Sequence, residues 1–97
     1  MNDASLYANK FQELIELARN AETGFEKAAI FAATQALANE FTEDDFDGYA
    51  LEKVESTRWH ICASLGYDIT NGHSPQQHLS WAFGSVITLK NVLEKNK

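Results

Sequence analysis

An acidic segment in the middle of the chain combines carboxylates with aromatic side chains. The residues that matter in it are Glu40, Glu43, Asp44, Asp45, Phe46 and Asp47. Such a surface suits a basic protein partner, because charge speeds the encounter and aromatic side chains hold the complex. In the alternative, the acids stabilise the start of a helix while Phe46, like its neighbour Phe41, lies in the core. We call residues 40–47 the acidic segment and predict that it binds a partner.

The acidic segment also resembles the beginning of a calcium-binding loop. Counted from Glu43, acids occupy the first, third and fifth places, and Gly48 occupies the sixth, as such a loop requires. The twelfth place, where a bidentate glutamate belongs, is Val54. The sequence therefore predicts no calcium site here.

The histidines and the single cysteine are the residues of this chain that could bind a transition metal. His60 and Cys62 are two positions apart, so on a helix their side chains point about 160° away from each other. His73 and His78 can converge, because one precedes a predicted helix and the other lies one turn inside it. A third ligand is not evident. We expect no metal and no cofactor.

The sequence also gives no sign of an enzyme. Cys62 lies on the flank of an apolar helical stripe, where a cysteine is typically a small buried hydrophobic residue. The chain contains none of the patterns GxGxxG, GxxxxGK[ST], HExxH or GxSxG. We expect a protein without catalytic residues.

Two charged residues, Asp47 and Arg58, fall inside the apolar stripe of the longest predicted helix. They are eleven positions apart, or about 16 Å along the helix, so they cannot pair with each other. Each therefore needs a partner from another element, or lies at an end of the bundle or in an open groove. Arg58 is either part of a structural ion pair or a polar anchor in a ligand groove.

Three aromatic residues lie away from the apolar stripes of their helices: Tyr49 and Trp59 on one, Trp81 on another. A helix with one stripe toward the core does not need large rings on its back. These rings predict self-association, most simply as a homodimer.

Apolar residues recur at helical spacing over 4–21, 24–40, 43–65 and from Pro75 to about Leu93. Helix boundaries are marked by a capping box at Thr23 and Glu26, by Gly66 as a terminator, and by Ser74 as a cap. Since Gly48 weakens a helix interior, the third helix has an alternative start at Asp47. We predict an all-α, single-domain, four-helix up-down bundle over residues 1–97, with the third helix central.

Charge is distributed unevenly along the 97 residues. The net charge is −6; residues 1–48 carry ten acids and three bases, whereas residues 49–97 carry four acids and five bases. A net-acidic domain does not ordinarily bind nucleic acid or anionic lipid. No apolar run approaches the roughly 20 residues of a membrane span, and no signal peptide is evident. With one cysteine, these features favour a cytoplasmic protein.

Three functions follow, in this order. The first is a non-catalytic acidic protein that inhibits or neutralises a basic partner. In size, charge and helical class the chain resembles bacteriocin immunity proteins and phage-encoded inhibitors of host defence, although no motif carries this likeness. The second is a sensor or sponge for a small molecule or nucleotide, with its groove near Arg58. The third is a structural subunit that only oligomerises.

Overall fold

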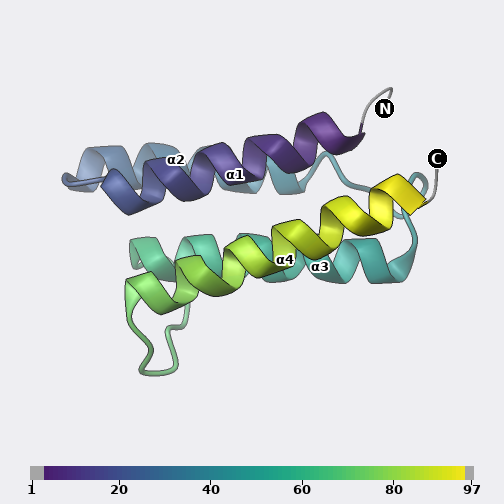
Figure 1. Ribbon diagram of the computed structural model, residues 1–97. Helices are drawn as coiled ribbons and strands as arrows, with labels where there is room; N and C mark the ends of the chain where they lie inside the picture. The colour runs from purple at the N-terminus through teal and green to yellow at the C-terminus, as the bar shows by residue number, and fades with distance from the viewer. Residues whose placement is uncertain (1–3, 96–97) are drawn as a thin grey trace.

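The structure is a computed structural model and describes residues 4–95, which form four helices and no strand. The helices are α1 (Ala4–Asn20), α2 (Gly24–Ala38), α3 (Gly48–Leu65) and α4 (Pro75–Lys95). Each helix runs opposite to the one before it, so both ends of the described chain lie at the same end of the bundle (Figure 1). The predicted all-α, four-helix up-down bundle is confirmed.

The helices form two layers, α1 with α2 and α3 with α4 (Figure 1). The most extensive contact joins α3 to α4. Helix α3 contacts each of the other three helices, as its predicted central place requires, but α1 does so as well. The α3–α4 pair is therefore the largest shared surface in the bundle.

Local signals set most of the helix boundaries. The Thr23 side chain accepts a hydrogen bond from the Glu26 amide at 3.0 Å, and Glu26 accepts one from the Thr23 amide at 3.1 Å. Gly66 ends α3 in the left-handed region at φ 90°, which a residue without a Cβ adopts at little cost. Ser74 accepts a hydrogen bond from the Gln77 amide. These three predicted boundaries are confirmed.

The third helix begins at Gly48 and not at Glu43, which was the longer of the two predicted starts. Asp47 has an extended backbone, and its side chain accepts a hydrogen bond from the Ala50 amide at 2.9 Å. Upstream, the amides of Asp45 and Phe46 both donate to the Thr42 carbonyl, which closes a separate turn. The acids at 43–45 therefore lie in this turn, ahead of the helix. Asp47 is the cap.

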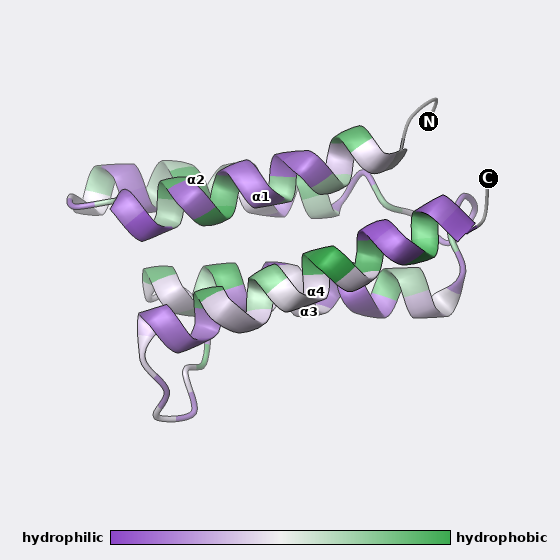
Figure 2. Ribbon diagram, viewed as in Figure 1, coloured by the Kyte–Doolittle hydropathy of each residue, from purple (hydrophilic) through white to green (hydrophobic). Residues whose placement is uncertain are grey.

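The buried apolar core takes residues from all four helices, and each of the four ribbons carries hydrophobic positions in Figure 2. At the end of the bundle near the acidic segment, Phe41 is the centre of a ring cluster. It packs on Phe11 with ring centroids 5.9 Å apart, on Phe46 at 4.9 Å and on Tyr7 at 6.0 Å. This packing fixes the 39–47 connection against the core.

Candidate ligand-binding groove

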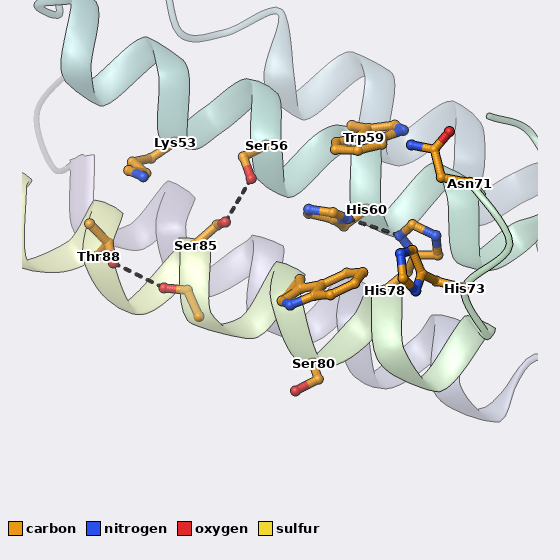
Figure 3. A pocket seen from close by; sticks show the side chains of 12 residues that line it. Lys53, Ser56, Trp59, His60, Asn71, His73, His78, Ser80, Ser85 and Thr88 are labelled. Carbon is orange, nitrogen blue, oxygen red and sulfur yellow. Dashed lines mark hydrogen bonds between the residues drawn. The ribbon is translucent and has the colours of Figure 1, made fainter. Parts of the chain in front are cut away.

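A groove of about 590 Å³ opens between α3, α4 and the loop 66–74 (Figure 3). Its volume lies in the range of sites that hold small molecules. One end is walled by aromatic and imidazole rings, and we call the site the ring-lined groove. The rings belong to Trp59, His60, His73, His78 and Trp81.

Helical spacing brings the polar and aromatic side chains of the ring-lined groove together. On α3, Lys53, Ser56 and His60 follow at intervals of three and four, which places them on one face. On α4, the same intervals place four more residues on the face that meets α3. Those residues are His78, Trp81, Ser85 and Thr88. Across the seam, Ser56 Oγ and Ser85 Oγ are 2.8 Å apart and share a hydrogen bond.

The rings contact one another closely. The His60 ring lies 4.4 Å from the Trp59 ring and 5.4 Å from the Trp81 ring, measured between centroids. The His73 ring meets Trp81 edge-on at 4.8 Å. Trp81 is still 39% exposed, whereas His60 and His78 are 8% and 1% exposed. The groove thus has buried imidazoles at its base and an accessible indole on its wall.

A hydrogen-bond chain determines the tautomer of each of the two buried histidines, that is, which ring nitrogen carries the proton. His78 Nε2 lies 2.8 Å from the Thr70 carbonyl oxygen, and a carbonyl can only accept, so Nε2 carries the proton. In neutral His78, Nδ1 is then an acceptor. His60 Nδ1 lies 2.9 Å from it and must donate. Neutral His60 therefore has a bare Nε2, on the Ser56 and Ser85 side of the ring in Figure 3.

Burial also favours the neutral form of His60. Loss of water around the imidazole lowers the pKa of His60, and the neighbouring His78 lowers it further. At neutral pH, the Nε2 of His60 therefore presents a lone pair to the groove.

The loop 66–74 is held in place by contacts that sequence spacing does not reveal. The Trp59 indole nitrogen donates to the Ile69 carbonyl at 3.1 Å. Tyr67 stacks on Phe31 of α2 with centroids 4.5 Å apart. At the tip, Asn71 and Gly72 both have positive φ, 53° and 82°, in the turn that the Asn-Gly pair predicted. The loop thereby brings Asn71 and His73 to the ring-lined groove.

Charges in the ring-lined groove differ from those of the whole chain. The chain has fourteen acids against eight lysines and arginines. Among the described residues that line the groove, none is acidic, while three are histidines and one is Lys53. The Lys53 ammonium lies 5.2 Å from the centre of the Tyr49 ring and has no carboxylate partner within residues 4–95. The described lining of the groove thus contains no carboxylate.

Arg58 does not line the ring-lined groove. Its guanidinium pairs with Glu55 in α3 and lies 3.3 Å from Asp68 in the loop and 3.3 Å from Gln35 in α2. The hydrogen bond to Glu55 is the main reason that the pKa of Arg58 is raised. Because Arg58 falls inside an apolar stripe, the sequence predicted that it needs a partner from another element. Asp68 and Gln35 are such partners, and through them Arg58 links α3 to the loop and to α2.

The acidic segment is exposed except at its aromatic residues. Glu40, Glu43, Asp44, Asp45 and Asp47 face solvent, whereas Phe46 is half-buried and packs on the core. The acids have no salt-bridge partner within the described chain. Binding of a partner by this segment stays a prediction.

The residues predicted to self-associate are unequally accessible. Tyr49 is 51% and Trp81 39% exposed, whereas Trp59 is only partly accessible. Trp59 and Trp81 both line the ring-lined groove, so the surface predicted for a dimer and the groove overlap. A ligand and a second copy of the chain would therefore contact the same two rings.

Cys62 and the histidines are the remaining residues that could act as a nucleophile or as metal ligands. Cys62 is fully buried, its sulfur 3.8 Å from Gln35 Oε1, and burial raises the pKa of its thiol. Over residues 4–95, no three histidine, cysteine or acidic side chains converge as metal ligands. His73 and His78 do converge, with ring centroids 6.0 Å apart, but the imidazole that hydrogen-bonds to His78 is that of His60, which sequence spacing did not indicate.

Comparison with known proteins gives no further guide to function. No protein-family model, curated protein or solved structure matches the chain. None of the described helices has the length and apolar character that crossing a membrane demands.

Proposed function

We propose that the protein binds a small anionic ligand in the ring-lined groove and acts as a sensor or sponge without catalysing a reaction. The observation that carries this proposal is the charge of the groove. A chain of net charge −6 keeps every acidic residue out of the described lining and places one lysine and three histidines there. Carboxylates near the site would repel an anion, and their exclusion removes that cost.

Lys53 is the group that attracts the anion. It is half-buried, and its ammonium contacts the Tyr49 ring in place of a carboxylate. A cation–π contact at a partly exposed site contributes only about 0.5–1 kcal/mol, so the charge remains available to a ligand. This arrangement moves the small-molecule function away from Arg58, which is already paired with Glu55 and Asp68.

The accessible rings supply apolar contact. Trp81 exposes 39% of its surface beside the buried His60 and His78. Pockets for small molecules commonly combine aromatic walls with a few convergent polar groups. Here Ser56, Ser85 and the histidines are those polar groups.

Intrinsic fluorescence tests this function directly, because both tryptophans of the chain line the groove. Titration with inosine 5′-monophosphate should change the tryptophan emission saturably. Lys53→Gln should weaken binding by about tenfold, the effect of losing one charge-assisted contact. Lys10→Gln is the matched control, because Lys10 also lies over a tyrosine, Tyr7, but on α1. No saturable change, or equal weakening by both variants, would contradict the proposal.

Binding of a basic protein by the acidic segment is the second candidate function, with inhibition or neutralisation of that partner as its outcome. It is favoured by five exposed acids that have no cationic partner within residues 4–95. Such charges mainly accelerate association and exclude unsuitable partners. Nucleic acid does not fit this surface, since phosphate would be repelled.

A further inference from the structure

The hydrogen-bond chain through the two buried histidines sets the polarity of the ring-lined groove. The Thr70 carbonyl determines the proton position on His78, and His78 determines it on His60. Nε2 of His60 is left as an acceptor, with no hydrogen-bond partner in the described part of the chain. A ligand that fills the groove must therefore offer a donor at this atom, or leave the acceptor unpaired at a cost in affinity.

The groups along the groove have a fixed order. Lys53 and His60 are seven residues apart on α3, which is about 10 Å along the helix axis. Between them lies the Ser56–Ser85 hydroxyl pair, in which only one hydroxyl hydrogen is used. The groove thus has a cationic end, a hydroxyl middle and an end formed by rings around one acceptor nitrogen (Figure 3).

The ring end favours a flat ligand. The His60 ring stacks on Trp59 at 30° between planes, and Trp81 is tilted by 42° to the His60 ring. The indole of Trp81 is accessible along the groove. Heteroaromatic rings such as nucleobases stack on indoles.

Resting on the function proposed above, we infer that the ligand is a planar heteroaromatic anion that donates a ring N–H to Nε2 of His60 and holds its anionic group toward Lys53. A nucleotide whose base has a ring N–H on its pairing edge, such as a hypoxanthine, guanine or uracil nucleotide, has this chemistry. Its ring edge carries an N–H, and a ribose separates the ring from the phosphate. The middle of the groove, with its serine hydroxyls, then faces the sugar.

Three related probes, two of them nucleotides of nearly equal size, test each part of the inference. Inosine 5′-monophosphate presents an N–H at ring position 1, adenosine 5′-monophosphate presents a lone pair there, and inosine lacks the phosphate. Inosine monophosphate should bind about tenfold more tightly than adenosine monophosphate, the value of one hydrogen bond. It should also bind about tenfold more tightly than inosine.

Variants of the histidines provide the second test. His60→Gln offers both a donor and an acceptor, so it should reduce the preference for inosine monophosphate over adenosine monophosphate to about twofold or less. Lys10→Gln is again the control, because Lys10 lies on α1 and does not line the groove. It should keep the preference. A preference that survives His60→Gln would overturn the inference.

A measurement on the unmodified protein covers the case in which a His60 variant does not fold. Imidazole nitrogen shifts from NMR should show His60 protonated at Nδ1 and His78 protonated at Nε2. The opposite tautomer of His60 would overturn the inference without any ligand.

The failures of the two proposals are distinguishable. If both nucleotides bind equally and Lys53→Gln weakens both, the assigned ring donor is wrong, whereas the anion-binding function stands. If neither nucleotide changes the tryptophan emission, both proposals are contradicted.

Discussion

Nδ1 of His60 and Nδ1 of His78 are 2.9 Å apart, although the two residues are eighteen positions apart and belong to different helices. Two imidazoles at this distance share one proton, because two N–H groups pointing at each other would clash. The Thr70 carbonyl decides which nitrogen of His78 is left to accept. A loop carbonyl thus determines, through two rings, which chemistry the ring-lined groove presents.

We predict that stability falls with acid in the window where His60 titrates. Because the pKa of His60 is lowered in the fold, the unfolded chain binds the proton first. The free energy of unfolding should therefore decrease as the pH falls from about 6.5, the unfolded value, through the lower folded value. Denaturant titrations at a series of pH values measure this. His78 contacts His60 directly, while His73 and Lys53 line the same groove. A slope that His60→Gln leaves unchanged would contradict the prediction.

Acid should also shift the preference of the ring-lined groove from inosine monophosphate toward adenosine monophosphate. One added proton on the histidine pair ends on Nε2 of His60, whichever ring formally carries the charge, since the Nδ1–Nδ1 bond needs only one proton. The groove then presents a donor. Affinity for adenosine monophosphate relative to inosine monophosphate should rise as the pH falls through the lowered pKa of His60. Fluorescence titrations at neutral and acidic pH test this, and an unchanged ratio would count against the hydrogen-bond chain.

The fold was predictable because its signals are local. Thr23 with Glu26, Gly66 and Ser74 each act within a few residues of the boundary they mark. The start of α3 was ambiguous because acids at 43–45 are equally typical of a first turn. Asp47 decides it, through a side-chain hydrogen bond that only one of the two starts permits.

The groove was not predicted, because it depends on how α3 faces α4. Sequence spacing relates His60 to Cys62 on its own helix, whereas its hydrogen-bond partner is His78 on another. Which residues of α3 face which residues of α4 depends on how the two helices pack, and the sequence of one helix does not determine this. The sequence did contain a signal for the groove. Polar and aromatic residues recur at intervals of three and four on both helices, whereas a face that packs in the core has apolar residues at these intervals.

The cap of α3 gives a prediction with an internal control. Asp47→Ala should lower the free energy of unfolding by about 0.5–2 kcal/mol, because the Ala50 amide loses its acceptor. Asp44→Ala removes the same charge from the turn upstream, where no hydrogen bond to its side chain occurs within the described residues, and should change stability by less than about 0.5 kcal/mol. Equal effects would mean that charge, not capping, stabilises the start of α3. Thermal or denaturant unfolding measures both.

Within the acidic segment, Phe46 should affect the stability of the fold, whereas Asp44 and Asp45 should affect the binding of a partner. Truncating a fully buried phenylalanine costs about 3–5 kcal/mol, and since Phe46 is half-buried on Phe41, Phe46→Ala should cost roughly half as much. Asp44→Asn with Asp45→Asn should leave stability nearly unchanged, because both side chains are exposed. It should slow association with a basic partner recovered from the source cells, and salt should slow the unmodified protein likewise. Unchanged association rates would leave the acids with a structural role only.

Self-association and ligand binding should compete, because Trp59 and Trp81 belong to both surfaces. Sedimentation at increasing concentration should show a homodimer, and saturating inosine monophosphate should shift it toward monomer. Trp81→Ser should weaken the dimer, since it removes a ring that is 39% exposed at the predicted contact. Phe25→Ser is the control, because Phe25 is 86% exposed but lies on α2. A dimer that is weakened by Phe25→Ser and not by Trp81→Ser would place the contact on α2, and a monomer at high micromolar concentration would leave the rings to the ligand.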